Sequence, residues 1–149
     1  MNVELSKAVK ITQAITVTNG AAGTADINGV TLDMANFEGV LIAVRMGAIT
    51  GGAVTSIKAQ QGAASDLSDA ADLAGTAQTI ADTDDEKTFY IDLYKPRERY
   101  VRLVVDRGTA NAVVSSADYI QYGPRSLPVA SHGSNVSGET HISPAEGTA

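Results

Sequence analysis

Two histidines are the residues of this chain best suited to acid–base chemistry near neutral pH. His132 and His141 stand nine positions apart, among serine and glycine, close to the C-terminus. A catalytic base must be held rigidly against its nucleophile, and a metal site needs further ligands at suitable spacing. The neighbouring sequence supplies neither. We therefore predict no catalytic residue and no metal ligand, and histidines that are solvated or packed against a partner.

An acidic cluster, Asp82 to Glu86, offers the carboxylates that calcium prefers. An EF-hand counted from Asp82 requires glycine at its sixth position and glutamate at its twelfth, where this chain has Lys87 and Leu93. Short acidic segments also form solvated turns without a ligand. The sequence favours such a turn between two strands and leaves cation binding by residues 82–86 open.

A basic cluster follows, in which five of the eleven Lys and Arg residues lie within 13 positions, at Lys95, Arg97, Arg99, Arg102 and Arg107. Clustered basic side chains can bind nucleic acid, but a net charge of −6 on the whole chain disfavours contact with phosphates. Arginine is also frequent at protein interfaces, where it pairs with carboxylates. We predict ion pairs within the chain or with a partner at Lys95, Arg97, Arg99 and Arg102, and no direct contact with nucleic acid.

The composition argues against several further classes of protein. The absence of cysteine removes disulfides, thiolate metal sites and cysteine nucleophiles. No glycine-rich phosphate loop is present, and no pair of carboxylates stands in a setting that would separate their pKa values. The longest apolar run is too short to cross a membrane, and the N-terminus lacks the apolar core of a signal peptide. We expect no enzyme, no cofactor and no membrane contact, for a protein made in the cytoplasm.

Apolar residues recur at every second position in most of the chain, which is the period of a β-strand. The run Val40–Val44 predicts a central strand buried on both faces, and Asn-Gly pairs at 19–20 and 28–29 predict tight hairpin turns. The expected strands are residues 11–17, 25–27, 30–32, 40–44, 55–61, 76–81, 87–93, 100–106 and 112–122. Residues 1–122 are therefore predicted to form an all-β domain, an antiparallel β-sandwich or jelly roll of about eight strands.

One segment departs from this period. Leu67, Ala70 and Ala74 follow helical spacing, while Ser65 and Gly75 fit an N-cap and a C-terminal stop. We predict one short helical turn over residues 66–74.

Residues 123–149 are expected to form an extended C-terminal arm. Their large aliphatic residues are Leu127, Val129, Val136 and Ile142, and they include no aromatic residue. Such a segment buries too little apolar surface to offset the loss of chain entropy on ordering. We therefore expect a partner outside the chain to hold the arm through these four side chains.

Several segments resemble small virion proteins of tailed bacteriophages. They are FEGVLIAV at 37–44, GAIT at 47–50, SIKAQ at 56–60, DLAGT at 72–76, YKPRERYVR at 94–102 and SPAEGTA at 143–149. The resemblance covers most of residues 37–149. It implies a capsid decoration, or cement, protein of the kind encoded near the major capsid protein, with a β-sandwich or jelly-roll core. It implies no active-site residue.

Three functions stay open on these grounds. The resemblance implies a homo-oligomeric structural protein on the capsid surface of a virion, where it bridges subunits of the major capsid protein. A head–tail connector or tail structural protein is the first alternative, and the number of copies in a particle would separate the two. A carbohydrate- or ion-binding β module is the second alternative, and it requires an exposed aromatic platform or a calcium cage.

Overall fold

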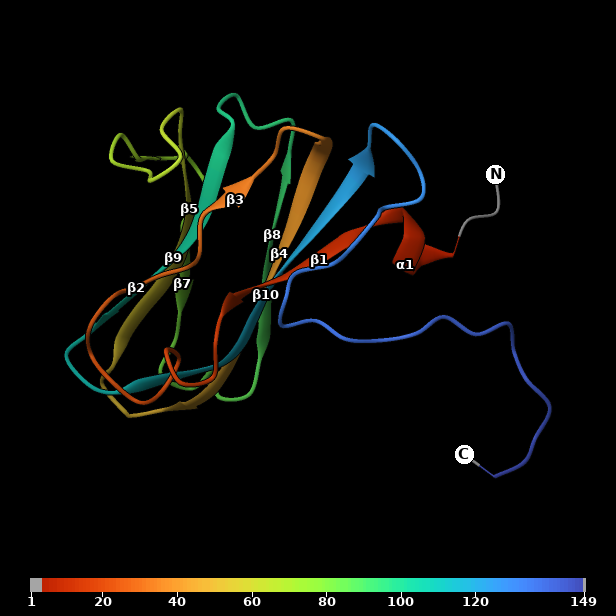
Figure 1. Cartoon of the computed structure of the whole chain (residues 1–149). Helices are drawn as coiled ribbons and strands as arrows, with labels where there is room; N and C mark the ends of the chain where they lie inside the picture. The colour runs from red at the N-terminus through yellow and green to blue at the C-terminus, as the bar shows by residue number, and fades with distance from the viewer. Residues whose placement is uncertain (1–3, 149) are drawn as a thin grey trace.

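β-Strands make up nearly all of the regular structure in the computed structural model, which describes residues 4–148 (Figure 1). A single helical turn, α1 (Leu5–Ala8), precedes the first strand. The strands are β1 (Lys10–Ile15), β2 (Ile27–Asn28), β3 (Leu32–Asp33), β4 (Phe37–Ile49), β5 (Val54–Gly62), β6 (Ala71–Asp72), β7 (Gln78–Ile80), β8 (Thr88–Tyr94), β9 (Tyr100–Gly108) and β10 (Ala112–Pro124). Except for β6, which lies within residues 66–74, they overlap the strands predicted from the period-two pattern, and β4 extends well beyond the apolar run at 40–44.

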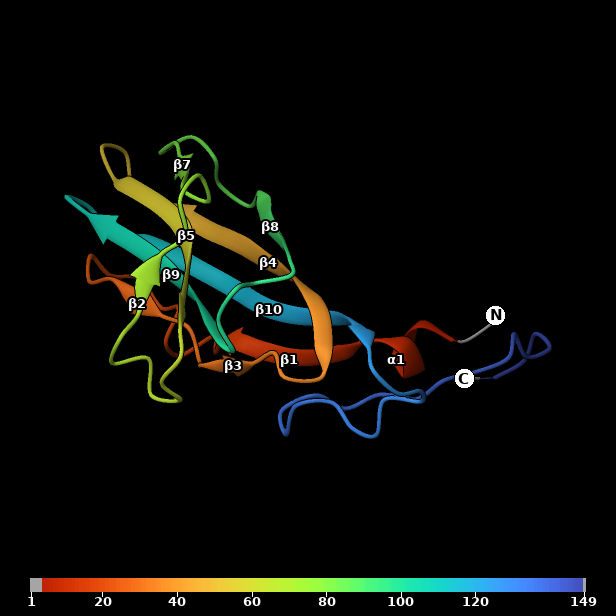
Figure 2. The ribbon, with the colours of Figure 1, turned by 90° about the horizontal axis from the view of Figure 1, so that it is seen from above.

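The strands form two antiparallel sheets that pack face to face (Figures 1 and 2). The four-stranded sheet has the order β1-β10-β4-β8, and the six-stranded sheet has the order β2-β9-β5-β6, with β3 also on β9 and β7 also on β5. If β2 with β3 and β6 with β7 each count as one interrupted strand, the fold has eight strands. The first then pairs with the eighth, the second with the seventh, the third with the sixth and the fourth with the fifth. This is the folded antiparallel ribbon of a jelly roll, which confirms the predicted architecture.

The core lies between the sheets and is built from the inward positions of the long strands. Val40, Ile42 and Val44 of β4 are fully buried, and so are Val101 and Leu103 of β9. Complete burial of an aliphatic side chain of this size contributes about 1.5–3 kcal/mol. These alternating positions therefore supply much of the driving force that holds the two sheets together.

β4 is buried on one face only, so the expectation of a central strand buried on both faces is wrong. Leu41 and Ala43, on the opposite side of the strand, are only partly buried. A jelly roll is a two-layer fold, and the outer face of each sheet borders solvent. The continuous apolar run therefore places the apolar side chains of Leu41 and Ala43 on the outer face of the four-stranded sheet.

β2 and β3 form an interrupted edge strand rather than the predicted hairpin. Both pair with the same neighbour, β9, at residues 104–105 and 100–101. Between them the Asn28-Gly29 pair lets the chain leave the ladder, and the N–H of Gly29 still donates to the carbonyl of Leu103 (2.8 Å). The N–H of Leu103, however, has no strand partner at this gap.

Tyr119 fills the gap from the opposite sheet. Its side chain is fully buried, and its hydroxyl accepts a hydrogen bond from the N–H of Leu103 (2.8 Å) and donates one to the carbonyl of Val30 (2.9 Å). Burial raises the pKa of Tyr119 far above its usual value, so the hydroxyl stays protonated. Two residues further along β10, the amide of Gln121 donates to the carbonyl of Asp33 (2.9 Å). Side chains of β10 thus bond the chain at Val30, in the gap between β2 and β3, and at Asp33 in β3, and so hold the interrupted edge strand in place.

Residues 66–74 do not form the predicted helical turn. Leu67 is buried and adopts a positive φ of 54°, which lies outside the right-handed helical region. The carboxylate of Asp69 accepts hydrogen bonds from the N–H groups of Ala63 (2.8 Å) and Ala64 (3.2 Å), and β6 pairs with the end of β5. Aspartate that bonds nearby N–H groups competes with a helix, and the edge of β5 offers partners that local spacing does not reveal.

Candidate interaction surface

The acidic residues 82–86 hold the turn between β7 and β8 against the β4–β5 hairpin. Asp85 accepts a hydrogen bond from the N–H of Ile49 (2.7 Å), and Asp82 accepts one from the N–H of Gly52 (2.7 Å). The two carboxylates therefore serve separate backbone donors instead of a shared centre. Among residues 4–148, no three acidic, histidine or cysteine side chains are grouped as a metal site requires.

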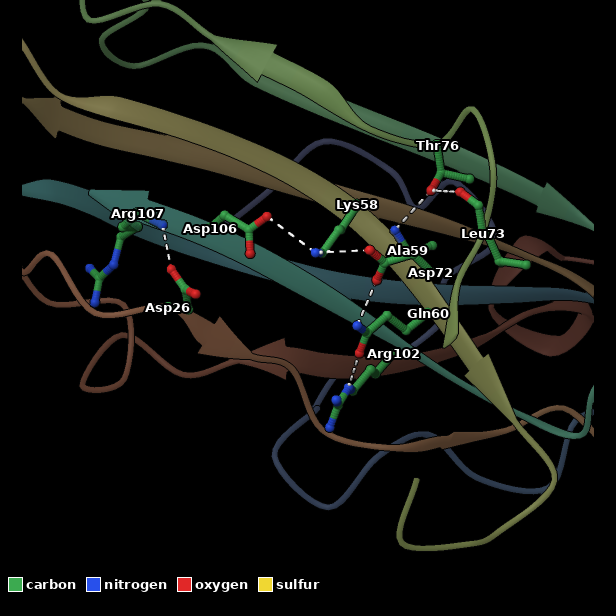
Figure 3. Close-up of polar contacts among 10 residues, drawn as sticks. All are labelled: Asp26, Lys58, Ala59, Gln60, Asp72, Leu73, Thr76, Arg102, Asp106 and Arg107. Carbon is green, nitrogen blue, oxygen red and sulfur yellow. Dashed lines mark hydrogen bonds and ion pairs between the residues drawn. The ribbon is translucent and has the colours of Figure 1, made fainter. Parts of the chain in front are cut away.

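The outer face of the six-stranded sheet is polar, and its side chains pair with one another (Figure 3). Lys58 lies between Asp72 (3.1 Å) and Asp106 (3.4 Å), and the hydrogen bond with Asp72 is the main cause of the raised pKa of Lys58. Gln60 donates to Asp72 (2.7 Å) and accepts from Arg102 (2.8 Å). Arg102 therefore belongs to a network within the chain, and the structure separates it from the other predicted contact residues.

The outer face of the four-stranded sheet is richer in aromatic side chains. Tyr90, Asp92 and Tyr94 occupy successive outward positions of β8, and the two tyrosines are 64% and 59% exposed. Tyr122 of β10 fills the space where a side chain at Gly39 would lie, and it donates a hydrogen bond to Asp92 (2.6 Å). Burial, and then this bond, raise the pKa of Tyr122 to about 12. The two sheets thus present chemically different outer faces.

Three of the predicted basic residues line a groove at one end of the sandwich. Lys95, Arg97 and Arg99 belong to the β8–β9 loop, and Arg125, one residue beyond β10, joins them around a space of about 830 Å³. The N–H of Lys95 donates to the carbonyl of Glu38 (2.7 Å), which fixes the start of the loop. Sequence reasoning missed Arg125, although it is the only Lys or Arg in residues 123–149. We call this space the basic groove.

Arg99 also forms a bidentate ion pair with Asp33 of β3. Its Nε lies 2.9 Å from Oδ1 of Asp33, and its Nη2 lies 2.8 Å from Oδ2. Both side chains are about half exposed, so the pair is screened by solvent. It nevertheless fixes the β8–β9 loop to the edge of the six-stranded sheet, and it places Arg99 in a structural role.

Acid is expected to weaken the fold through this ion pair. The hydrogen bond from Arg99 lowers the pKa of Asp33 below its ordinary value of 3.8. A carboxyl group with a lower pKa in the folded state adds stability above its unfolded pKa, and this stability disappears as the pH falls through the folded value. Asp33→Asn should therefore have a lower Tm than the wild type at neutral pH, and the difference should shrink as the pH falls below the ordinary pKa of 3.8 and through the lowered pKa of folded Asp33. Thermal unfolding followed by circular dichroism measures both, and a difference that persists in acid would contradict this role of the pair.

The first half of the C-terminal arm lies along the protein's own edge strand. The N–H of Val129 donates to the carbonyl of Lys7 (2.8 Å), and the N–H of Gly133 donates to the carbonyl of Ile11 in β1 (2.8 Å). The N–H of Ile11 donates in turn to Nδ1 of His132 (3.1 Å), so the imidazole stands where a neighbouring strand would place a carbonyl. Residues 129–133 are therefore held by α1 and β1 of the same chain, and contact of the arm with a partner stays a prediction.

The second half of the arm differs, because residues 137–148 are exposed throughout. Figures 1 and 2 show this half running outward from the body of the protein, beyond α1. Of the four aliphatic residues predicted to contact a partner, Leu127 and Ile142 are exposed, the latter by 90%. Val129 and Val136 are partly buried, and Val136 borders a hollow lined by residues of α1 and by Ile11.

The fold, rather than the sequence, has a counterpart among known proteins. No protein-family model and no curated protein matches this chain. A crystal structure of the PBSX exported protein XepA is similar in fold, with a TM-score of 0.51 and 14% sequence identity. The similarity covers 99% of this chain and 46% of the XepA chain, so this chain spans about half the length of that one. In the part of the chain described by the structure, no helix has the length and hydropathy needed to span a membrane.

Proposed function

We propose that this chain is a structural virion protein of a tailed bacteriophage, and that it acts as a decoration, or cement, protein on the outside of the head. The observation that carries the proposal is the exposed half of the arm, residues 137–148, which projects from a jelly-roll domain. A compact domain with a projecting chain can bind one subunit of the major capsid protein and reach another. A modest contact that repeats over a shell is strengthened by multivalency.

The fold supports a phage structural role in general. XepA, which shares the fold, is a phage-related protein, and jelly rolls are frequent in viral capsid proteins. The segment at 94–102, one of those that resemble phage virion proteins, forms the loop that lines the basic groove. The capsid surface as the site of action, the major capsid protein as partner and self-association are our proposals.

We propose that the role is not enzymatic and needs no cofactor. The polar side chains that could have served in catalysis have structural partners instead. Asp82 and Asp85 accept hydrogen bonds from backbone N–H groups, and His132 accepts one from the edge strand β1. A catalytic base held in this way would have to give up a bond that maintains the fold.

A position at the head–tail junction, or in the tail, is the nearest alternative. A projecting arm also suits a ring of connector subunits, so the geometry alone supports both positions. Many copies spread over the head indicate decoration, whereas a single ring at one vertex indicates a connector. Mass spectrometry of purified particles counts the copies, and a low-resolution map of the particle locates them.

The aromatic face of β8 favours a second candidate function, carbohydrate binding. Tyr90 and Tyr94 are exposed on the same face, about 13 Å apart along the strand at 3.3 Å per residue, and Asp92 lies between them. Sugar rings stack on exposed aromatic side chains, and a carboxylate can bind their hydroxyl groups. Calorimetry with a glycan panel tests this candidate, because the decoration role requires no heat of sugar binding.

Removal of residues 137–149 is expected to weaken capsid binding by at least about tenfold, because the arm supplies one of two linked contacts. The truncation begins at residue 137 so that the part of the arm on β1 stays in place. The domain should remain folded, with a Tm close to that of the wild type. Co-sedimentation of the purified protein with phage heads that lack it measures the binding.

A matched control replaces residues 137–149 by a glycine-serine chain of equal length, which keeps the length and removes the side chains. This control should bind as weakly as the truncation. If both bind like the full chain, the arm has no part in attachment. If the full chain does not bind heads at all, the decoration proposal is wrong.

A further inference from the structure

The basic groove holds three cationic side chains without a carboxylate partner. Within residues 4–148, Lys95, Arg97 and Arg125 form no ion pair, whereas Arg99 is paired with Asp33. The groove also has an apolar lining, contributed by Met34, Phe37, Pro96 and Pro124, and its acidic members are Glu38 and Glu98. Unpaired basic side chains around an apolar floor suit an extended segment that carries carboxylates and a few apolar residues.

The groove adjoins a hollow that is lined on one side by a piece of extended chain. This neighbouring hollow of about 290 Å³ shares Phe37, Pro124 and Arg125 with the basic groove, and residues of the protein's own arm, 126 and 128–131, form its far side. A second extended segment in the groove would therefore lie next to the first half of the resident arm. The end of the sandwich that carries the basic groove therefore already packs against one extended segment, the first half of the arm.

The exposed half of the arm has the chemistry that such a groove would bind. Residues 138–148 contain Glu139, which lies 3.5 Å from His141, and Glu146. They contain no Lys or Arg, and their larger apolar residues are Ile142 and Pro144. Ile142 is 90% exposed. Nearer the body, the hydroxyls of Ser6 and Thr140 form a hydrogen bond, and residues 138–140 line a hollow beside α1. The segment extends away from the body (Figures 1 and 2), so it is presented to another molecule.

We infer that residues 138–148 of one copy of this chain dock in the basic groove of a second copy. The carboxylates of the arm complement the unpaired Lys95, Arg97 and Arg125, and Ile142 covers the apolar floor. Each copy donates an arm and receives one, so the contact closes in a dimer that exchanges arms, closes in a larger ring or continues as a chain. On a head this contact links neighbouring copies and so strengthens their binding to the capsid by multivalency, and in a connector it joins neighbouring subunits.

Two charge-reversed variants of the full chain test the contact. The groove variant is Arg97→Glu with Arg125→Glu, and the arm variant is Glu139→Lys with Glu146→Lys; Arg99 is left unchanged because it pairs with Asp33. Sedimentation equilibrium should show wild-type self-association that weakens with salt, and each variant alone should have an apparent Kd raised by about tenfold or more. An equimolar mixture of the two should associate again, because reversed arms fit reversed grooves and normal arms fit normal grooves.

Arg45→Glu is the matched control, since Arg45 is exposed on β4 and outside the groove; it should associate like the wild type. Restored association in the mixture supports the inference, since a general loss of folding or of positive charge would not be repaired by mixing. A wild-type chain that stays monomeric at millimolar concentration overturns it. Arm-dependent binding to heads by such a monomer would leave the decoration role standing and make the capsid the partner of the arm. Association that both variants retain also overturns the inference.

Discussion

Replacing Tyr119 by phenylalanine is expected to lower the free energy of unfolding by about 2–3 kcal/mol. The ring keeps its place in the core, so the change removes a hydroxyl and little else. Without it the N–H of Leu103 and the carbonyl of Val30 both lose their partner. A buried polar group left without a hydrogen bond costs about 1–3 kcal/mol, and the N–H of Leu103 lies in the interior of the sandwich.

Urea unfolding at neutral pH measures the effect, with Tyr122→Phe as the matched control. That change removes a hydroxyl from the same strand, but the bond lost is with Asp92 on the outer face, where water can replace it. A loss of about 1 kcal/mol or less is expected for the control. Equal losses of free energy for the two variants would show that the buried hydrogen bonds of Tyr119 stabilise the fold no more than the exposed bond of Tyr122 does.

Replacing Arg107 by methionine is expected to cost about 2–4 kcal/mol, because one guanidinium serves three backbone carbonyls. Nε donates to the carbonyl of Ala25 (2.7 Å), and Nη1 donates to those of Ala21 (2.8 Å) and Ala112 (2.7 Å). Arg107 is partly buried, so water screens these bonds only in part, and the same burial lowers the pKa of Arg107. The side chain therefore anchors the long β1–β2 loop to the hairpin of β9 and β10.

Arg107→Lys distinguishes this geometry from charge alone. A lysine keeps the positive charge but lacks the planar fork of donors, so most of the loss should remain. In both Arg107 variants, backbone hydrogen exchange should become faster in the β1–β2 loop, residues 16–26. The control Arg45→Met removes an exposed arginine and should change the free energy of unfolding by no more than about 0.5 kcal/mol. Full stability in Arg107→Lys would contradict the anchoring role.

The alternation of apolar residues was sufficient to predict the sandwich, because burial of one face per strand imposes a period of two on the sequence. Long strands such as β9 and β10 were therefore found close to their true bounds. The errors fall where local spacing competes with distant partners. Residues 66–74 have helical spacing, but Asp69 and the edge of β5 bind their backbone. The Asn28-Gly29 pair predicts a hairpin, but β9 offers both flanking segments a longer ladder.

The candidate surface was only partly predictable, for a similar reason. The basic loop was visible as a cluster in the sequence, and three of its residues do line one groove. Arg125 joins them because β4 begins where β8 and β10 end. Arg102 is not part of the groove because it lies within a strand and faces the other outer surface. The contact of His132 with Ile11 spans 121 positions, and no spacing rule reveals such a pair.

The placement of His132 and Gly133 on β1 has a consequence for solubility. An uncovered edge strand presents a row of N–H and C=O groups that other chains can extend, which leads to aggregation. Residues 132 and 133 satisfy both backbone groups of Ile11 and so cap this edge without adding a strand of their own. The C-terminal arm thus covers the edge strand with residues 132 and 133, and it projects from the body with residues 137–148. A chain cut at residue 128 would lose both and is expected to form aggregates, whereas a chain cut at residue 137 would stay dispersed.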